Sequence, residues 1–334
     1  MACMMTGHRM PARKTSKTVR RALARALALS LPAWAASGCN IGTGAVCGGV
    51  SGVYAPHAVD AGVPACRDDG TAPQRVPACD AFCGSPSPAP GSADAPCCMS
   101  LEDPGVVSCP VDCTGRRPTG LSAARAVPDD PRSLGALFAR MAFLERASID
   151  AFRILEDDLR RHRAPRALVQ AARRAKRDEH RHFRTTRALA RRHDADVPPP
   201  QRATAGARSL EAIAVENARE GCVREGFGAL VALWQAHAAG DAHVRAAMTR
   251  IAREETSHAA LAWSVHGWAM GRLDPQARRR VRRALREEAA LIAHGRPDEP
   301  DPALARSAGL PTRAQTRRLA SAWIDQFLRR PRRA

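Results

Sequence analysis

The chain is poor in tyrosine, in other aromatic residues and in lysine. Tyr54 is the only tyrosine in 334 residues, and aromatic residues make up 4% of the sequence. The formal net charge of +19 comes almost entirely from arginine, with Asp and Glu interleaved along the chain. A nucleic-acid surface usually clusters its positive charge and adds aromatic side chains for stacking. The composition therefore argues against nucleic-acid binding and favours a weak attraction to anionic membrane surfaces.

The N-terminus is basic and then briefly apolar. Residues 1–38 hold seven basic and no acidic side chains, and the apolar run Ala26–Ala36 is too short to cross a bilayer. This pattern is typical of a secretory signal. The sequence Ala36-Ser37-Gly38-Cys39 resembles a bacterial lipobox, so we expect residues 1–38 to be a signal peptide and Cys39 to carry lipid. The prediction is an exported, membrane-anchored lipoprotein of the bacterial cell envelope. Ordinary cleavage near Ala35, giving a soluble periplasmic or secreted protein, is the alternative.

Most of the eleven cysteines lie in one Gly-, Pro- and Ser-rich stretch. Cys3 belongs to the leader and Cys222 lies far downstream; the remaining eight after Cys39 are Cys47, Cys66, Cys79, Cys83, Cys97, Cys98, Cys109 and Cys113. An even number of cysteines in an exported segment predicts disulfides, although the sequence does not fix their pairing. A zinc module built on two Cys-x3-Cys pairs is the alternative. We expect residues 39–130 to form an irregular, disulfide-stapled segment followed by a linker.

Two Glu-x-x-His motifs occur in the chain, and each follows a helical segment with a glutamate of its own: Glu145 precedes Glu179 and His182, and Glu220 precedes Glu255 and His258. The upstream segments, 145–155 and 220–230, align without gaps, with a second acid, a Phe and a Leu in register. From the residue counts, roughly 0.4 such motifs are expected by chance, so two in a repeated context indicate a real pattern. The sequence predicts a pseudo-repeat of two helical hairpins.

In a helix, residues three apart lie on one face, so the Glu and His of each motif point the same way. The neighbours on that face are small or apolar, for example Ala175 beside Glu179 and Ile251 beside Glu255. Four carboxylates facing a helical interior need compensating charge. Two divalent cations would supply it, and mixed carboxylate and imidazole ligation suits iron or manganese.

This ligand pattern is that of carboxylate-bridged di-metal bundles. Over roughly residues 133–270 the chain resembles the ferritin-like superfamily, closest in style to its rubrerythrin or erythrin branch. The resemblance implies two iron ions, or alternatively manganese, with the following ligands: Glu179 and Glu255 as bridges, Glu145 and Glu220 as terminal ligands, and His182 and His258 one on each metal.

Several neighbouring residues compete with these assignments. Glu216 lies one turn before Glu220 and could replace it as a ligand. Asp150 and Glu225 lie five residues beyond the upstream glutamates, about 140° round an α-helix, so we expect them to form ion pairs on the outer face. His180 and Glu254 are expected to point away from the site. The alternative for the whole set is salt-bridged surface residues on Arg-rich helices.

The expected architecture is mainly α, with a four-helix bundle over residues 131–271 and a long crossover between its second and third helices. Capping patterns predict the bounds of the four helices. The first runs from Pro131 to about Arg161, with Asp130 as its cap, and the second from Ala164-Pro165 to about His193. The third runs from Ser209 to about Ala238, and the fourth from Gly240-Asp241 to about Met270. Short, long and short connections are typical of a ferritin-like bundle. Residues 272–334 are expected to form two further helices that pack on the bundle, one from Asp274-Pro275 and one carrying Leu319, Trp323 and Phe327.

The resemblance implies an oxidoreductase of the ferroxidase or peroxidase type that uses oxygen or peroxide. No Cys-x-x-Cys pair follows the bundle, so the electron-transfer unit of rubrerythrins is absent and an external electron donor is implied. Tyr54 lies outside the bundle, which argues against a tyrosyl-radical enzyme like the small subunit of ribonucleotide reductase. Two alternatives stay open: a non-catalytic envelope lipoprotein that uses the metals structurally or sequesters them, and a recognition lipoprotein acting through its cysteine-rich segment.

Overall fold

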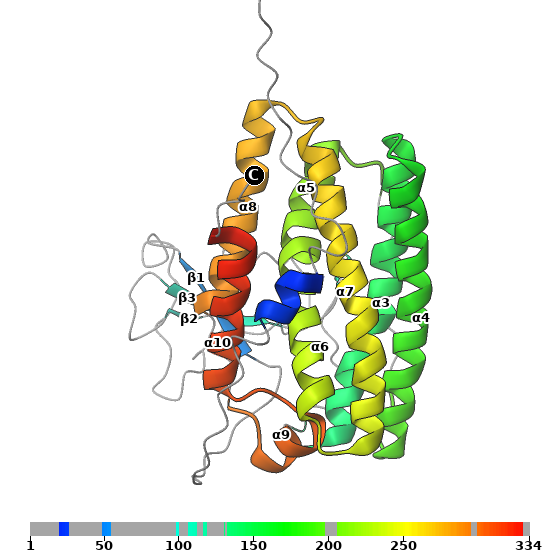
Figure 1. Cartoon of the computed structure of the whole chain (residues 1–334), viewed down its shortest axis with the longest axis vertical. Helices are drawn as coiled ribbons and strands as arrows, with labels where there is room; N and C mark the ends of the chain where they lie inside the picture. Colours follow the sequence, from blue (N-terminus) through cyan, green and yellow to red (C-terminus); the bar gives the residue numbers. More distant parts are fainter. Residues whose placement is uncertain are drawn as a thin grey trace, which may run out of the picture.

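The computed structural model of the chain describes residues 20–26, 49–54, 98–99, 106–111, 116–118, 130, 132–197, 206–294 and 299–329. The described part is mainly helical, as predicted (Figure 1). Its helical elements are α3 (Leu134–Arg161), α4 (Arg166–Arg192), α5 (Leu210–Glu216), η1 (Asn217–Glu225), α6 (Gly226–Ala238), α7 (Ala242–Met270), α8 (Pro275–His294), α9 (Pro302–Ala308), α10 (Arg313–Ile324) and η2 (Asp325–Arg329), and residues 20–26 are helical as well.

Four long helical segments lie side by side, and we call them the four-helix unit: α3, α4, the continuous segment formed by α5, η1 and α6, and α7 (Figure 1). The connections 162–165 and 239–241 are short, whereas 193–209 is long, which confirms the predicted order of short, long and short. Part of the long connection, residues 198–205, lies outside the described residues. Short connections make consecutive helices antiparallel neighbours, so each half of the unit is a helical hairpin.

The helix starts show how local sequence sets the boundaries. The Ser209 hydroxyl accepts a hydrogen bond from the Ala212 N–H, and Asp274 accepts from the Ala277 N–H, as the capping patterns predicted. The first helix differs from the prediction, because Ser133 rather than Asp130 is its cap and accepts from the Ala136 N–H. The Asp130 carboxylate instead accepts from the Arg132 N–H within the preceding turn.

The third segment contains a π-helical stretch, η1, that the sequence analysis did not predict. In a π-helix the backbone hydrogen bonds join residues five apart rather than four, so the turn is wider. Such stretches inside α-helices occur frequently at functional sites.

The C-terminal helices pack on the four-helix unit through one apolar cluster. Val281 of α8 and Trp323 of α10 belong to the same buried cluster as Trp234 and Trp263 of the unit. Leu23, in the helical residues 20–26, is fully buried in this cluster as well. The short helix α9 was not predicted; its Leu304 packs against Leu137 at one end of α3.

Part of the cysteine-rich segment is a small sheet rather than irregular chain. Strands β1 (Gly49–Tyr54), β2 (Cys98–Met99) and β3 (Val106–Val111) form an antiparallel sheet in the order β1-β3-β2. Cys98 and Cys109 lie on its strands, while the predicted lipid site Cys39 and the other six cysteines of this segment lie outside the described residues. The disulfides and the zinc alternative therefore stay predictions.

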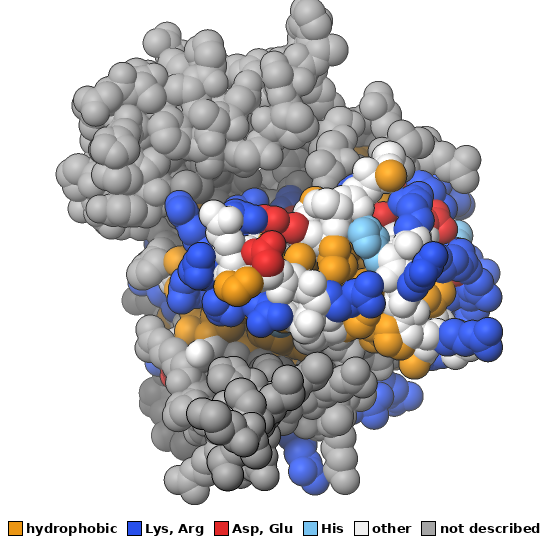
Figure 2. Space-filling view, turned by 90° about the horizontal axis from the view of Figure 1, so that it is seen from above, with side chains coloured by type: hydrophobic (Ala, Val, Ile, Leu, Met, Phe, Trp, Pro, Cys, Tyr) orange, Lys and Arg blue, Asp and Glu red, His pale blue; other side chains and the backbone are white. Residues whose placement is uncertain are grey.

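Seen along the length of the four-helix unit, the described surface carries many Lys and Arg side chains, with Asp and Glu side chains among them (Figure 2). This mixture agrees with the interleaved charges of the sequence. Among the residues that the structure describes, no helix combines the length and the apolarity that a membrane span requires.

Candidate metal centre

The structure brings five of the six predicted metal ligands together inside the four-helix unit, and a different glutamate takes the sixth place. Two groups of side chains have ligand atoms within 4.8 Å of one another: Glu145, Glu179, His182 and Glu255 form the first, and Glu179, Glu225 and His258 form the second. Because Glu179 belongs to both groups, they form one cluster of six residues, which we call the Glu/His cluster. Four helical segments, α3, α4, η1 and α7, contribute to it.

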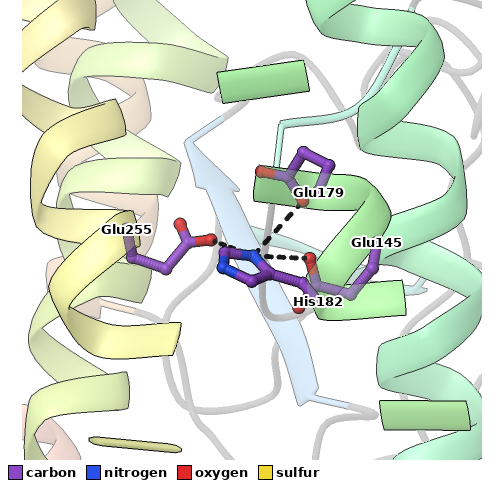
Figure 3. Close-up of side chains that lie close together, drawn as sticks. All are labelled: Glu145, Glu179, His182 and Glu255. Carbon is purple, nitrogen blue, oxygen red and sulfur yellow. Dashed lines mark ion pairs between the residues drawn. The ribbon is translucent and has the colours of Figure 1, made fainter. Parts of the chain in front are cut away.

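The Nδ1 atoms of the two histidines mark the centre of the cluster. Nδ1 of His182 lies 3.1 Å from Glu255 Oε1, 3.5 Å from Glu145 Oε2 and 3.6 Å from Glu179 Oε2. In Figure 3, Glu255 reaches this ring from α7, and Glu145 and Glu179 reach it from the side of α3 and α4.

The second histidine repeats this arrangement. Nδ1 of His258 lies 3.0 Å from Glu179 Oε1 and 3.5 Å from Glu255 Oε1, and the two ring centroids are 5.8 Å apart. Glu179 thus presents one oxygen to each imidazole, and Oε1 of Glu255 lies near both. These two carboxylates occupy the middle of the cluster, between the histidines.

The other nitrogen of each imidazole contacts a carboxylate from the opposite hairpin. Nε2 of His182 lies 2.8 Å from Glu254 Oε2, and Nε2 of His258 lies 3.3 Å from Asp178 Oδ2. Because an ionised carboxylate only accepts, each Nε2–H donates, so the neutral form of each imidazole would direct the lone pair of Nδ1 into the cluster. Histidines that ligate metals are commonly oriented by such outer carboxylates.

The sequence analysis missed these two carboxylates, although a signal was present. Asp178 and Glu254 occupy the same position in the two motifs, directly before Glu179 and Glu255. The expectation that Glu254 points away from the site is wrong: it bridges His182 and Arg181, whose Nη2 lies 2.7 Å from Glu254 Oε1. A third acid repeated in register would have identified the pair.

Glu220 is not part of the Glu/His cluster, so this predicted ligand is corrected. Its carboxylate lies 3.6 Å from the Arg117 Nε and 3.5 Å from the Arg224 Nε, and the side chain is 17% exposed. Burial raises the pKa of Glu220 to about 7, more than the nearby Arg117 lowers it. The rival Glu216 is also outside the cluster, where it pairs with Arg116 and Arg208.

Glu225 takes the place that was predicted for Glu220. In a regular α-helix it would lie about 140° away from Glu220, but the wider π turn of η1 brings a residue five positions on closer to the same face. The Glu225 side chain is therefore buried beside Glu179 and His258 instead of forming an outer ion pair. Asp150, its counterpart in the repeat, does form ion pairs, with Arg146 and Arg153, but it is buried rather than on the outer face as predicted. The only signal for Glu225 in the sequence was its alignment with this second acid.

The charges of the Glu/His cluster depend on one another. Burial raises the pKa values of Glu145 and Glu225 well above the ordinary carboxyl range, and the neighbouring Glu179 and Glu255, respectively, raise them further. Burial also acts to raise the pKa of Glu179, but contacts with both imidazoles outweigh it and lower that pKa. For Glu255, likewise, His258 and His182 outweigh burial and lower the pKa.

The histidines respond in the opposite direction. Burial acts to lower the pKa values of His182 and His258, but the surrounding carboxylates outweigh it and raise them well above the ordinary value. Without a metal, protons on the imidazoles and on two carboxyl groups therefore balance the buried negative charge.

Four buried atoms of the Glu/His cluster have no hydrogen-bond partner of acceptable geometry: Nδ1 of His182, Nδ1 of His258, Oε2 of Glu179 and Oε2 of Glu225. Unsatisfied buried polar atoms are uncommon because each costs about 1–3 kcal/mol. Imidazole nitrogen and carboxylate oxygen are ligands for iron, manganese and zinc. The cluster is thus a buried set of Glu and His side chains that could hold metal ions.

A separate cavity of about 640 Å³ lies on the surface between α4 and α7. Arginines line it together with His243: Arg181, Arg184, Arg192 and Arg250. None of the six residues of the Glu/His cluster lines this cavity. Arg181, however, also holds Glu254, so the cavity is connected to His182 through two side-chain contacts.

Comparison with known proteins adds no relative. No protein-family model matches the chain, and no curated protein and no solved structure matches it either. The geometry of the cluster and the sequence are therefore the evidence for its function.

Proposed function

We propose that the chain is a ferritin-like, carboxylate-bridged di-metal protein and that it acts as an oxidoreductase of the ferroxidase or peroxidase type. The observation that carries the proposal is the position of Glu179 and Glu255, each of which faces the Nδ1 atoms of both histidines. Surface ion pairs would not place six ionisable side chains of four helical segments around two buried imidazoles. This arrangement supports two neighbouring metal ions rather than one.

The proposed ligands divide into two positions. Glu145 and His182 would hold one metal, Glu225 and His258 would hold the other, and Glu179 and Glu255 would contact both. Four carboxylates carry a formal charge that two divalent cations neutralise, which removes the cost of burying them. Iron is the proposed metal because of the resemblance to the ferritin-like superfamily, and manganese is the alternative.

Two bound iron ions would supply redox chemistry toward oxygen or peroxide. The residues of the chain would hold the ligand side chains in position and protect the site from water. Glu254 and Asp178 hold the Nε2 protons, which fixes the direction of each imidazole. The buried Phe152 ring packs 5.0 Å from the His258 ring and would limit the access of water to that imidazole. Tyr54 lies in β1 and outside the four-helix unit, which argues against a tyrosyl radical. No Cys-x-x-Cys pair follows the four-helix unit, so the proposal includes an external electron donor.

Export is a proposal that rests on the N-terminal sequence. The expected cleavage site and Cys39 lie outside the described residues. In the full-length chain, Leu23 and Ala26 of the leader are buried in the apolar cluster of the four-helix unit. Cleavage after residue 38 would therefore expose the apolar surface that these two side chains cover.

The proposal is tested on the mature chain by metal analysis, by an absorption spectrum and by peroxide-dependent oxidation of an external donor. We expect about two iron ions per chain and turnover with peroxide or oxygen. The variant His182→Ala should lose iron and turnover. His180→Ala is the matched control, because His180 lies on the same helix, is exposed and is not in the cluster.

The outcomes separate the candidate functions. An iron-free and inactive protein would contradict the proposal. Tight metal binding without turnover under any donor would favour the structural or sequestering alternative instead. Equal effects of His182→Ala and His180→Ala would show that the Glu/His cluster is not the site of the activity.

A further inference from the structure

A short piece of chain from outside the four-helix unit enters the Glu/His cluster. Arg116 is 1% exposed, and its backbone links two helical segments of the unit. The Arg116 N–H donates to Glu225 Oε1 at 3.0 Å, while the Arg116 carbonyl accepts from the Ser148 hydroxyl of α3 at 2.8 Å. We call residues 116–118 the strap, since they join η1 to α3 at the metal centre.

The guanidinium of Arg116 anchors the strap. Its Nη1 donates to Asn217 Oδ1 and its Nη2 to Glu216 Oε1, both at 3.1 Å. Asn217 in turn donates to the Ala262 carbonyl of α7 at 2.9 Å. A buried guanidinium is strongly unfavourable unless it is paired and hydrogen-bonded, and here a carboxylate and an amide provide those partners. These contacts fix the position of the Arg116 backbone.

The strap acts on one cluster residue in particular. Because the Arg116 N–H holds Oε1 of Glu225, the carboxylate has a fixed orientation, and Oε2 is the oxygen without a hydrogen-bond partner. Glu145, which lies beside His182 as Glu225 lies beside His258, shows no such backbone contact among the described residues. Glu145 is 9% exposed, whereas Glu225 is 1% exposed. The two halves of the cluster are therefore unequal.

We infer that the strap is a positioning element that makes the Glu225–His258 position the tighter of the two metal positions, and that the Glu145–His182 position exchanges its metal with solution. This inference rests on the proposed di-metal function. A ligand held in its bound orientation loses less conformational entropy when the metal binds, so its affinity is higher. In the proposed ferroxidase reaction, the exchangeable position is the one that takes up the substrate metal ion.

Titration of the metal-free full chain with Mn²⁺, followed by calorimetry, tests the inference. Wild-type protein should bind in two separate steps. Arg116→Ala should weaken the tight step about 10–100-fold, the usual effect of removing an outer partner of a ligand, and leave the weak step unchanged. Arg117→Ala is the matched control, since Arg117 is in the same strap but pairs with Glu220 outside the cluster. Glu145→Gln should remove the weak step alone.

Ser148→Ala provides a second variant in case Arg116→Ala disturbs folding, which helical circular dichroism would reveal. It removes the contact with the Arg116 carbonyl and should weaken the tight step by a smaller factor. The inference is overturned if Arg116→Ala, or Ser148→Ala where the former does not fold, leaves the tight step unchanged or weakens both steps equally. Wild-type protein that binds no metal would instead overturn the proposed function.

Discussion

At the scale of single residues, the protons of the Glu/His cluster determine how stability depends on pH. The pKa values of Glu145, Glu225, His182 and His258 are raised in the folded protein, so the folded chain retains protons that the unfolded chain releases as pH rises. The contribution of these four groups to stability must therefore fall as pH rises above the pKa range of ordinary carboxyl groups.

Three carboxyl groups respond in the opposite direction. The pKa of Glu254 is lowered to about 2, chiefly by His182, and the pKa values of Glu179 and Glu255 are lowered too. These three groups lose their stabilising contribution as pH falls below that range.

The metal-free protein should accordingly be most stable at mildly acidic pH and lose stability toward alkaline pH. Metal ligands must be deprotonated before they bind, so bound metal should reverse the alkaline part of this trend. Thermal unfolding across the pH range, with a chelator and with saturating metal, measures both curves. A metal-free protein that gains stability steadily up to alkaline pH would contradict the assignment of these protons.

The exchange of Glu220 for Glu225 gives a second prediction at this scale. Glu225→Gln should lower the metal content from about two ions to about one per chain, because it removes a charged ligand of one position. Glu220→Gln should keep both ions, since a carboxyl with a pKa of about 7 is partly protonated at neutral pH and lies outside the cluster. Metal analysis of the two variants in parallel decides between them. Loss of metal from Glu220→Gln alone would restore the ligand set expected from the sequence.

The sequence could predict the residues of the Glu/His cluster that lie on regular helices and could not predict the one on η1. Glu179 with His182, and Glu255 with His258, are three residues apart on α-helices, so spacing alone places each pair on one face. The same reasoning placed Glu225 on the outer face because it assumed an α-helical turn. The π turn has no periodicity of its own in the sequence, and long-range contacts such as Asn217 to Ala262 accompany it.

At the scale of elements, η1 depends on a close approach at Gly221. A Cβ at this position would lie 2.8 Å from Asn217 Oδ1, 2.9 Å from Ala262 Cβ and 2.9 Å from Arg116 Nη1. No side chain fits there without moving α7 or the strap. Gly221 is thus the residue that allows η1, α7 and Arg116 to pack together.

Gly221→Ala should destabilise the protein by about 1–3 kcal/mol, the usual cost of inserting a methyl group into a packed interior. Gly267→Ala is the matched control on α7, because a Cβ there meets no atom within 4 Å. Since Gly is unfavourable inside a helix, the control should stabilise the protein by about 0.5–1 kcal/mol. Chemical denaturation of both variants gives the two free energies of unfolding. Equal values would show that η1 tolerates a side chain and is not fixed by this contact.

Capping residues explain why most helix boundaries could be predicted and one could not. Ser209 and Asp274 stand alone before their helices, so the pattern leaves no other cap. Before α3 the chain offers both Asp130 and Ser133, and both can cap a helix. The Asp130 carboxylate bonds to the Arg132 N–H in its own turn, which leaves Ser133 to start the helix. The local sequence alone therefore does not show which of the two residues caps α3.

At the scale of the whole molecule, the C-terminal helices are part of the core that supports the Glu/His cluster. The Trp323 ring of α10 is fully buried and lies against Gly226, where a Cβ would be 3.1 Å from it. Gly226 directly follows Glu225, the cluster residue at the end of η1. The amphipathic pattern of the last helix predicted that it packs inward, but no sequence pattern indicated that it packs next to a residue of the Glu/His cluster.

Trp323→Ala should therefore affect both stability and metal binding. Removing a fully buried tryptophan costs about 3–5 kcal/mol, and Phe327, whose ring lies 5.3 Å from that of Trp323 and 5.7 Å from that of Trp263, loses a stacking partner. Trp323→Phe keeps part of the ring and should cost less. Denaturation of the metal-free variants should show one transition, because α10 and the four-helix unit share one apolar cluster. A cost below about 1 kcal/mol, or a separate early transition with unchanged metal affinity, would show that α10 folds as an independent appendage rather than as a support for Glu225.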